Sequence, residues 1–143
     1  MTSSAFRIDG LDHVAINVRD VARSVAWYRD VLGFERQYEA AWGDYPAVVT
    51  AGGSGLALFP VQGDSPKPRP GRDVLSMRHV AFRVSAENFA AAQRELAARD
   101  IAFEFQDHQI SQSIYLHDPD GHEIELTTYE IGNEPADSRR RPQ

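Results

Sequence analysis

His13, His79 and Glu125 have the side chains of metal ligands, and a repeat in the sequence relates their positions. Residues 11–18 align with residues 77–84 at an offset of 66, which places His13 over His79. The same offset maps Phe59 onto Glu125. Two imidazoles and one carboxylate form the ligand set of a mononuclear divalent-metal site. We therefore expect a metal site in which Phe59, at the fourth equivalent position, leaves coordination positions open. The alternative is a structural cluster of hydrogen-bonded His and Glu side chains.

The segment that carries Glu125 begins with a turn and continues as a strand. Residues 118–121, Asp-Pro-Asp-Gly, have the composition of a tight β-turn, because proline presets φ and glycine tolerates positive φ. Beyond it, acidic and apolar side chains alternate, so Glu123 and Glu125 share one face of the predicted strand. A carboxylate that faces inward needs a partner. We expect Glu123 to lie at the rim of the site.

Alternation and helical spacing predict the same elements in each half of the chain. Residues 11–19 alternate as a half-buried strand, and Asp20 and Gly33 delimit the helix that follows. Ser85 is the predicted cap of the second helix. The remaining predicted elements are strands at 34–40, 45–50 and 55–60, a strand at 78–84, a helix at 86–99, and strands at 101–106, 113–117 and 122–129.

The chain is therefore predicted to adopt an α+β fold of two βαβββ modules, arranged with pseudo-two-fold symmetry as an open β-cup around the metal. We expect one structural domain overall. Its predicted parts are an N-terminal lead at 1–10, the first module at 11–61, a Pro/Gly linker at 62–76, the second module at 77–130 and a flexible tail at 131–143.

Composition restricts the function classes. The formal charge of −6 argues against nucleic-acid binding, and the basic run Arg139–Arg141 lies in the predicted tail. The absence of cysteine excludes disulfides, thiolate ligands and a cysteine nucleophile. No segment resembles a membrane span or a signal peptide. We expect a cytoplasmic protein with a small-molecule substrate and neither a nucleic-acid nor a membrane partner.

The paired modules, the ligand-type residues and the Asp-Pro-Asp-Gly turn resemble the vicinal oxygen chelate superfamily over nearly all of residues 11–130. That resemblance implies that His13, His79 and Glu125 are the metal ligands and that the chain forms a homodimer. It implies one divalent metal per site, with Fe(II) favoured and Mn, Zn, Ni or Co also accepted. The substrate is expected to chelate this metal through adjacent oxygens.

Residues 107–119 are similar to the signature of small extradiol ring-cleavage dioxygenases. His108, Tyr115 and Glu125 match in order and spacing, so the resemblance implies catalytic roles for His108 and Tyr115, a catechol-like substrate and O₂ as co-substrate. Two features differ from that pattern. Position 106 is Gln, and no histidine occurs between His13 and His79.

Three other activities of the superfamily remain as alternatives. A glyoxalase-like isomerase or lyase usually needs a fourth ligand where Phe59 lies. A thiol transferase acting on fosfomycin-like antibiotics needs a basic pocket, for which Arg83 is the candidate. A metal-free protein that binds a small molecule is the non-enzymatic alternative. Trp42 and Tyr45, with Phe59 and Arg83, are the predicted substrate-pocket residues.

Overall fold

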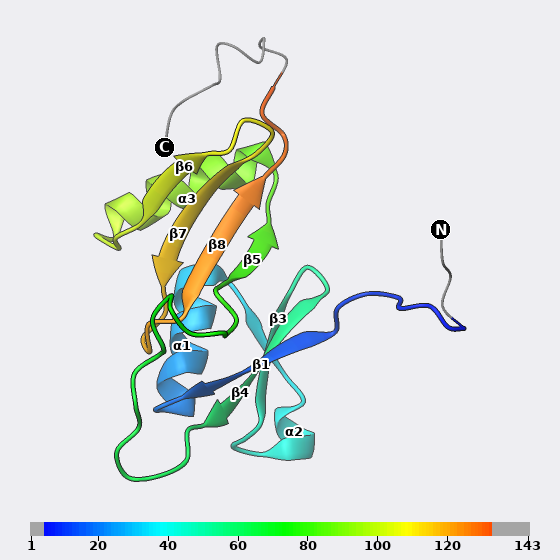
Figure 1. The fold of residues 1–143 in the computed structure, drawn as a ribbon, viewed down its shortest axis with the longest axis vertical. Coiled ribbons are helices and arrows are strands. Elements are labelled where there is room, and N and C mark those ends of the chain that lie inside the picture. The colour runs from blue at the N-terminus through cyan, green and yellow to red at the C-terminus, as the bar shows by residue number, and fades with distance from the viewer. Residues whose placement is uncertain (1–4, 133–143) are drawn as a thin grey trace. The chain divides into compact units, whose positions relative to one another are not determined.

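The computed structural model describes residues 5–132, and the chain divides into two compact units, Met1–Pro66 and Lys67–Gln143 (Figure 1). The predicted tail from residue 133 onward, with Arg139–Arg141, lies outside the described residues. Each unit contains one βαβββ module, as the sequence predicts. None of the helices in residues 5–132 combines the length and apolar character that a membrane crossing requires.

Unit 1 is a mixed four-stranded sheet in the order β1-β4-β3-β2, with β1 parallel to β4. Helix α1 packs against β3 and β4. Its ends are those that the sequence predicts: the Asp20 side chain accepts a hydrogen bond from the Arg23 amide at 3.0 Å, and Gly33 is left-handed with φ 72°. The elements are β1 (His13–Val18), α1 (Val21–Leu32), β2 (Glu35–Gln37), α2 (Glu39–Trp42), β3 (Ala47–Ala51) and β4 (Ser54–Pro60).

The predicted strand at 34–40 is wrong beyond Gln37. Tyr38 is left-handed, with φ 62°, and the short helix α2 follows immediately. A left-handed residue cannot continue a strand, so the chain leaves the sheet at this point. The Arg36 side chain then holds the turned segment by donating to the carbonyl of Gly43 at 2.7 Å. Two positive-φ glycines, Gly52 and Gly53, form the predicted hairpin turn between β3 and β4.

Unit 2 repeats this plan with the sheet order β5-β8-β7-β6. The Ser85 hydroxyl caps α3 by accepting from the Asn88 amide at 3.1 Å. The strand predicted at 101–106 begins only at Glu104, because Asp100 (φ 56°) and Ile101 close the C-terminus of the helix. The elements are β5 (Val80–Arg83), α3 (Ala86–Ala98), β6 (Glu104–Asp107), β7 (Gln112–His117) and β8 (Glu123–Thr128).

In each unit one face of the sheet is apolar and covered by the helix (Figure 1). In unit 2 this core contains Ile114, Ile124 and Leu96, each at most 2% exposed. Because side chains alternate along a strand, the acidic residues of β8 lie on the opposite face, which the helix does not cover. The face of this sheet opposite the helix, which we call the open face, therefore carries the side chains that could bind a metal or a substrate.

The strand registers correct one part of the predicted repeat. The offset of 66 relates β1 to β5, but Ala15 pairs with Ala57 whereas Ala81 pairs with Glu125. The connections between the first and last strands are two residues longer in unit 2. The counterpart of Glu125 is therefore Ala57, and the assignment of Phe59 to that position is wrong. Phe59 lies on the same face of the sheet as Ala57, two residues further along β4.

Candidate metal centre

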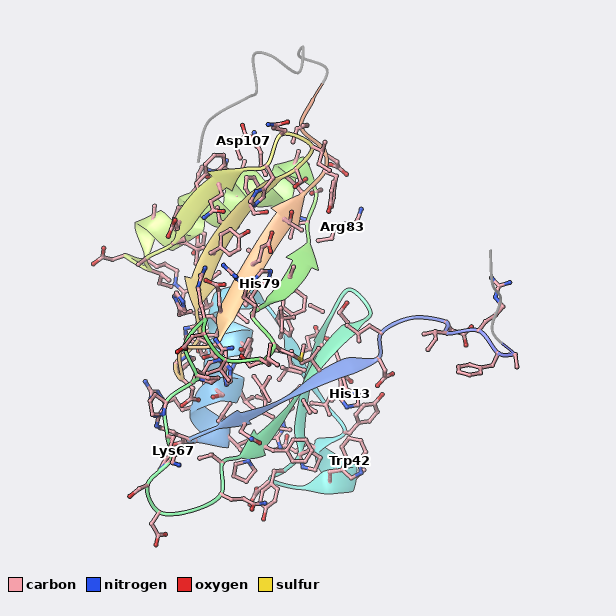
Figure 2. All side chains as sticks on the ribbon, viewed as in Figure 1. His13, Trp42, Lys67, His79, Arg83 and Asp107 are labelled. Atoms are coloured by element: carbon pink, nitrogen blue, oxygen red, sulfur yellow. The ribbon has the colours of Figure 1, made fainter. Side chains whose placement is uncertain are left out.

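The open face of the unit 2 sheet gathers polar side chains from three adjacent strands. Glu125 on β8 pairs with Ala81 on β5 and with Tyr115 on β7. Ser113 and Glu123 lie on the same face, because each is two residues along its strand from Tyr115 or Glu125. Figure 2 shows His79 at the residue before β5, next to the same sheet. Residues far apart in sequence are thus brought together by strand pairing alone.

Glu125 is only 8% exposed, and both of its carboxylate oxygens have partners. His79 Nε2 lies 2.9 Å from Oε1, and the Ser113 hydroxyl donates to Oε2 at 2.6 Å. Ser113 is itself completely buried and also contacts the Thr127 hydroxyl at 3.0 Å. A buried carboxylate needs such compensation. Ser113 fixes one oxygen and leaves the other directed at the imidazole.

Glu123 lies on the other side of the His79 ring, with Oε1 3.4 Å from Nδ1. The Nδ1 atom is buried and has no hydrogen bond within the described residues. The two carboxylates thus lie at opposite nitrogens of the ring, and Nε2 is the nitrogen within hydrogen-bonding distance of one of them, Glu125. Glu123 thus orients the imidazole, a more specific position than the predicted rim.

The turn before β8 is held together by Asp118, which is 5% exposed. Its Oδ1 accepts from the amides of Asp120 and His122, both at 2.9 Å. Gly121 has φ 86°, the left-handed geometry expected from the sequence. Since His122 immediately precedes β8, these bonds set where the strand begins and therefore which face Glu125 occupies.

Tyr115 and His108 form a second polar pair on this face. The Tyr115 hydroxyl lies 3.0 Å from His108 Nε2, and the Tyr115 ring meets the edge of the His79 ring at a centroid distance of 5.8 Å. Burial raises the pKa of Tyr115, and the charge and hydrogen bond of Glu125 raise it further, against an opposing hydrogen bond from Ser113. The phenol therefore keeps its proton at neutral pH and acts as a donor.

The third predicted ligand, His13, belongs to unit 1 and begins β1 (Figure 2). Its side chain is 47% exposed, and Nδ1 lies 2.8 Å from Asp12 Oδ2. As with His79, a carboxylate beside Nδ1 leaves Nε2 available. Among the residues that the structure describes, no three His, Asp or Glu side chains already form a group that could hold a metal ion.

The donor atoms that are present fit a divalent cation. The His79 Nε2 and Glu125 Oε1 atoms are 2.9 Å apart, one nitrogen and one oxygen of the kind that first-row metals accept. Glu123 is not a third ligand of the same ion, because it faces the opposite ring nitrogen. His79 and Glu125 therefore present two donor atoms of the kind that a divalent cation accepts.

The predicted pocket residues are accessible side chains in both units. In unit 1, Trp42 on α2 is 50% exposed and contacts the Tyr38 ring at 5.2 Å, Tyr45 is 57% exposed and Phe59 37%. In unit 2, Arg83 lies on the Glu125 face by register, but its guanidinium is over the Tyr129 ring, 4.8 Å from the centroid. Figure 2 shows Arg83 extending outward from the end of β5.

Ser113 and Asp12 were missed as residues that support the site. The sequence holds a signal for each, since Ser113 shares strand parity with Tyr115 and Asp12 immediately precedes His13. What the sequence lacks is the pairing of β7 with β8, which brings Ser113 to Glu125 rather than to any other residue.

Comparisons with known proteins agree with this fold. Residues 10–126 match the profile of the Glyoxalase/Bleomycin resistance protein/Dioxygenase superfamily. The metallothiol transferase FosB of Staphylococcus epidermidis is 33% identical over 125 residues, which cover 85% of this chain and 84% of that protein. Catechol-2,3-dioxygenase of Bacillus subtilis (strain 168) is 29% identical over 117 residues, covering 81% of this chain but 40% of that protein.

Among solved structures, a glyoxylase/bleomycin resistance protein/dioxygenase domain from Frankia sp. EAN1pec is similar to this chain with a TM-score of 0.72 and 22% identity. The match covers 89% of this chain and 96% of that one. At this identity the similarity concerns the fold, and it extends over both βαβββ modules.

Proposed function

Because the chain belongs to the Glyoxalase/Bleomycin resistance protein/Dioxygenase superfamily, we propose that it is a divalent-metal enzyme that adds a thiol to a small, oxygen-bearing electrophile. The observation that carries this choice is the match to a metallothiol transferase over nearly the whole of both chains. The match to a catechol dioxygenase covers less than half of that protein. The ring-cleavage activity favoured by the sequence signature is therefore the second candidate.

The proposed ligands are His13, His79 and Glu125. His79 and Glu125 already lie side by side, and each histidine has a carboxylate at Nδ1 that leaves Nε2 for a cation. Mn, Zn, Ni, Co and Fe(II) all accept two imidazoles and one carboxylate. When bound, the cation withdraws electron density from a coordinated substrate oxygen and makes the adjoining carbon electrophilic.

The chain's own residues position the site and move protons. The thiol must come from outside, because the chain contains no cysteine. As the sulfur forms its bond to carbon, the thiol gives up its proton to solvent, a carbon–oxygen bond breaks and the freed oxygen takes up a proton. Tyr115 is the proposed proton donor, and His108, 3.0 Å from its hydroxyl, is the group that restores its proton.

A specific contact supports the second candidate, an extradiol dioxygenase. The hydrogen-bonded pair of His108 and Tyr115 is the pair that the sequence signature of those enzymes implies, and it lies beside His79 and Glu125. In that reaction O₂ is consumed and a catechol ring opens. Oxygen uptake therefore separates the two candidates.

The test is to load chelator-treated protein with Mn²⁺ and to follow free thiol in a mixture of glutathione or cysteine with a small epoxide such as fosfomycin. We expect thiol loss that needs the metal, proceeds without oxygen and falls at least about 100-fold in Glu125→Gln, which removes a ligand charge. Gln112→Ala, on the covered face of the same sheet, is the matched control and should retain the rate. Oxygen uptake with catechols and no thiol loss would instead establish the dioxygenase.

A further inference from the structure

Unit 2 contains a pocket of about 340 Å³ on the loop that precedes β5. Ten residues line it, eight of them from residues 69–78, together with His117 at the end of β7 and Glu123 at the start of β8. Three of the loop residues are arginines: Arg69, Arg72 and Arg78. We call this the arginine pocket. The sequence predicts residues 62–76 as a Pro/Gly linker and a strand from residue 78, and it assigns no function to the three arginines.

The arginine pocket is a local concentration of positive charge in an acidic chain. Three arginines and a single carboxylate residue, Glu123, line it, although the chain as a whole carries a formal charge of −6. Arg72 lies 3.6 Å from Glu123, and Arg78 forms no ion pair with any described residue. Like charges gathered in one place repel each other unless a counter-ion joins them. The charge balance therefore favours an anionic ligand.

The loop is folded so that its arginines are held together. Arg69 donates from Nη2 to the carbonyl of Met77 at 2.9 Å, which joins the two ends of the segment 69–77. A guanidinium donates through five N–H groups, so one bond to the backbone leaves other donors for a ligand. Planar guanidinium groups match the oxygen pairs of carboxylates, phosphates and phosphonates.

The remaining lining suits an organic molecule rather than an inorganic ion alone. Pro70, Val74 and Met77 contribute apolar surface next to the arginines. The volume of about 340 Å³ lies within the range of small-molecule sites, and such sites combine apolar walls with a few polar groups. The pocket also shares Glu123 with His79, at 3.4 Å from its Nδ1. It therefore borders the candidate metal ligands.

We propose that the arginine pocket is a subsite for the oxyanion group of an organic substrate or co-substrate, bound by Arg72 and Arg78. The identity of the reacting molecule rests on the proposed function. The prediction that the pocket binds an anion does not. A phosphonate on the electrophile and a carboxylate on the thiol share the required chemistry. The experiment distinguishes a phosphonate from a carboxylate group by comparing how tightly inorganic phosphate and acetate bind.

The experiment is an NMR titration of ¹⁵N-labelled, chelator-treated protein with inorganic phosphate and, separately, with acetate, at constant ionic strength. We expect saturable shifts in the amides of residues 69 and 71–78 and in the His117 side chain. Arg72→Gln and Arg78→Gln should each weaken binding about tenfold, the loss expected for one charged hydrogen bond. Arg94→Gln, an exposed arginine on α3 outside the pocket, makes the same charge change and should bind as the wild type does.

Two results of the titration would overturn the subsite. One is an absence of saturable shifts in residues 69–78 with either anion. The other is equal binding by Arg72→Gln, Arg78→Gln and Arg94→Gln, which would mean that only net charge matters. Because the titration contains neither metal nor thiol, it gives an answer even if the thiol-transfer assay fails. Conversely, the wild-type enzyme could be active in the thiol-transfer assay while the Arg78→Gln variant has the same KM. That result would support the proposed function and contradict the subsite.

Discussion

Glu125 shows how a single charge is kept in a nearly buried position. One carboxylate oxygen accepts a hydrogen bond from the Ser113 hydroxyl at 2.6 Å, and the other lies 2.9 Å from His79 Nε2. Glu123 then orients the far side of the His79 ring. Partners of this kind set the direction and basicity of a ligand, and their loss commonly weakens metal binding without removing any ligand. The proposed metal site therefore depends on residues outside the proposed ligand set.

Ser113→Ala tests this dependence. Without the hydroxyl, one oxygen of Glu125 loses a charge-assisted hydrogen bond, and we expect the affinity for Mn²⁺ or Zn²⁺ to fall roughly 10- to 100-fold. Competition with a chromophoric chelator measures it. Gln112→Ala, the neighbouring residue whose side chain lies on the other face, is the control. Equal affinities of the two variants would show that Ser113 does not position the carboxylate.

At the scale of elements, helix caps and tight turns determine where each strand begins. Asp20 and Ser85 occupy equivalent positions at the start of α1 and α3, and each caps the amide three residues later. Asp118 holds the turn before β8 in a similar way, by accepting from the amides two and four residues later. Since a shift of one residue moves every side chain of a strand to the opposite face, these local bonds protect the placement of the site.

Asp20→Ala should destabilise the protein by about 1 kcal/mol, because an orphan amide at the start of α1 loses its acceptor. Urea unfolding, followed by circular dichroism, measures this change. Asp20→Asn retains a side-chain oxygen for the cap and should stay within a few tenths of a kcal/mol of the wild type. If both variants are equally destabilised, charge rather than capping is responsible.

At the scale of the whole molecule, binding of a cation at the proposed ligands is coupled to folding. A ligand that binds only the folded protein stabilises it by mass action. The metal should therefore contribute to global stability as well as to chemistry, and this contribution is measurable even when the substrate is unknown.

A cation at about 100 times its dissociation constant should add ~2.7 kcal/mol, which raises the Tm by roughly 8 °C for a chain of this size. Differential scanning fluorimetry of chelator-treated protein with and without Mn²⁺ measures the shift. His13→Ala should lose most of it, while His122→Ala serves as a histidine control outside the proposed ligand set. A full shift in His13→Ala would remove that residue from the proposed set.

The sequence by itself determined the two modules, their helix caps and the equivalence of His13 with His79, because alternation, capping and repeats are local patterns. It also placed Glu125 on the polar face of its strand. The tertiary structure decided what depends on register and loop geometry. The strand registers show that the counterpart of Glu125 is Ala57 and not Phe59, because the connections of unit 2 are two residues longer and this insertion cannot be located from the sequence. Strand pairing also brings Ser113 to Glu125. Folding of residues 69–78 brought the three arginines together, because a proline- and glycine-rich loop has no periodicity from which contacts can be predicted.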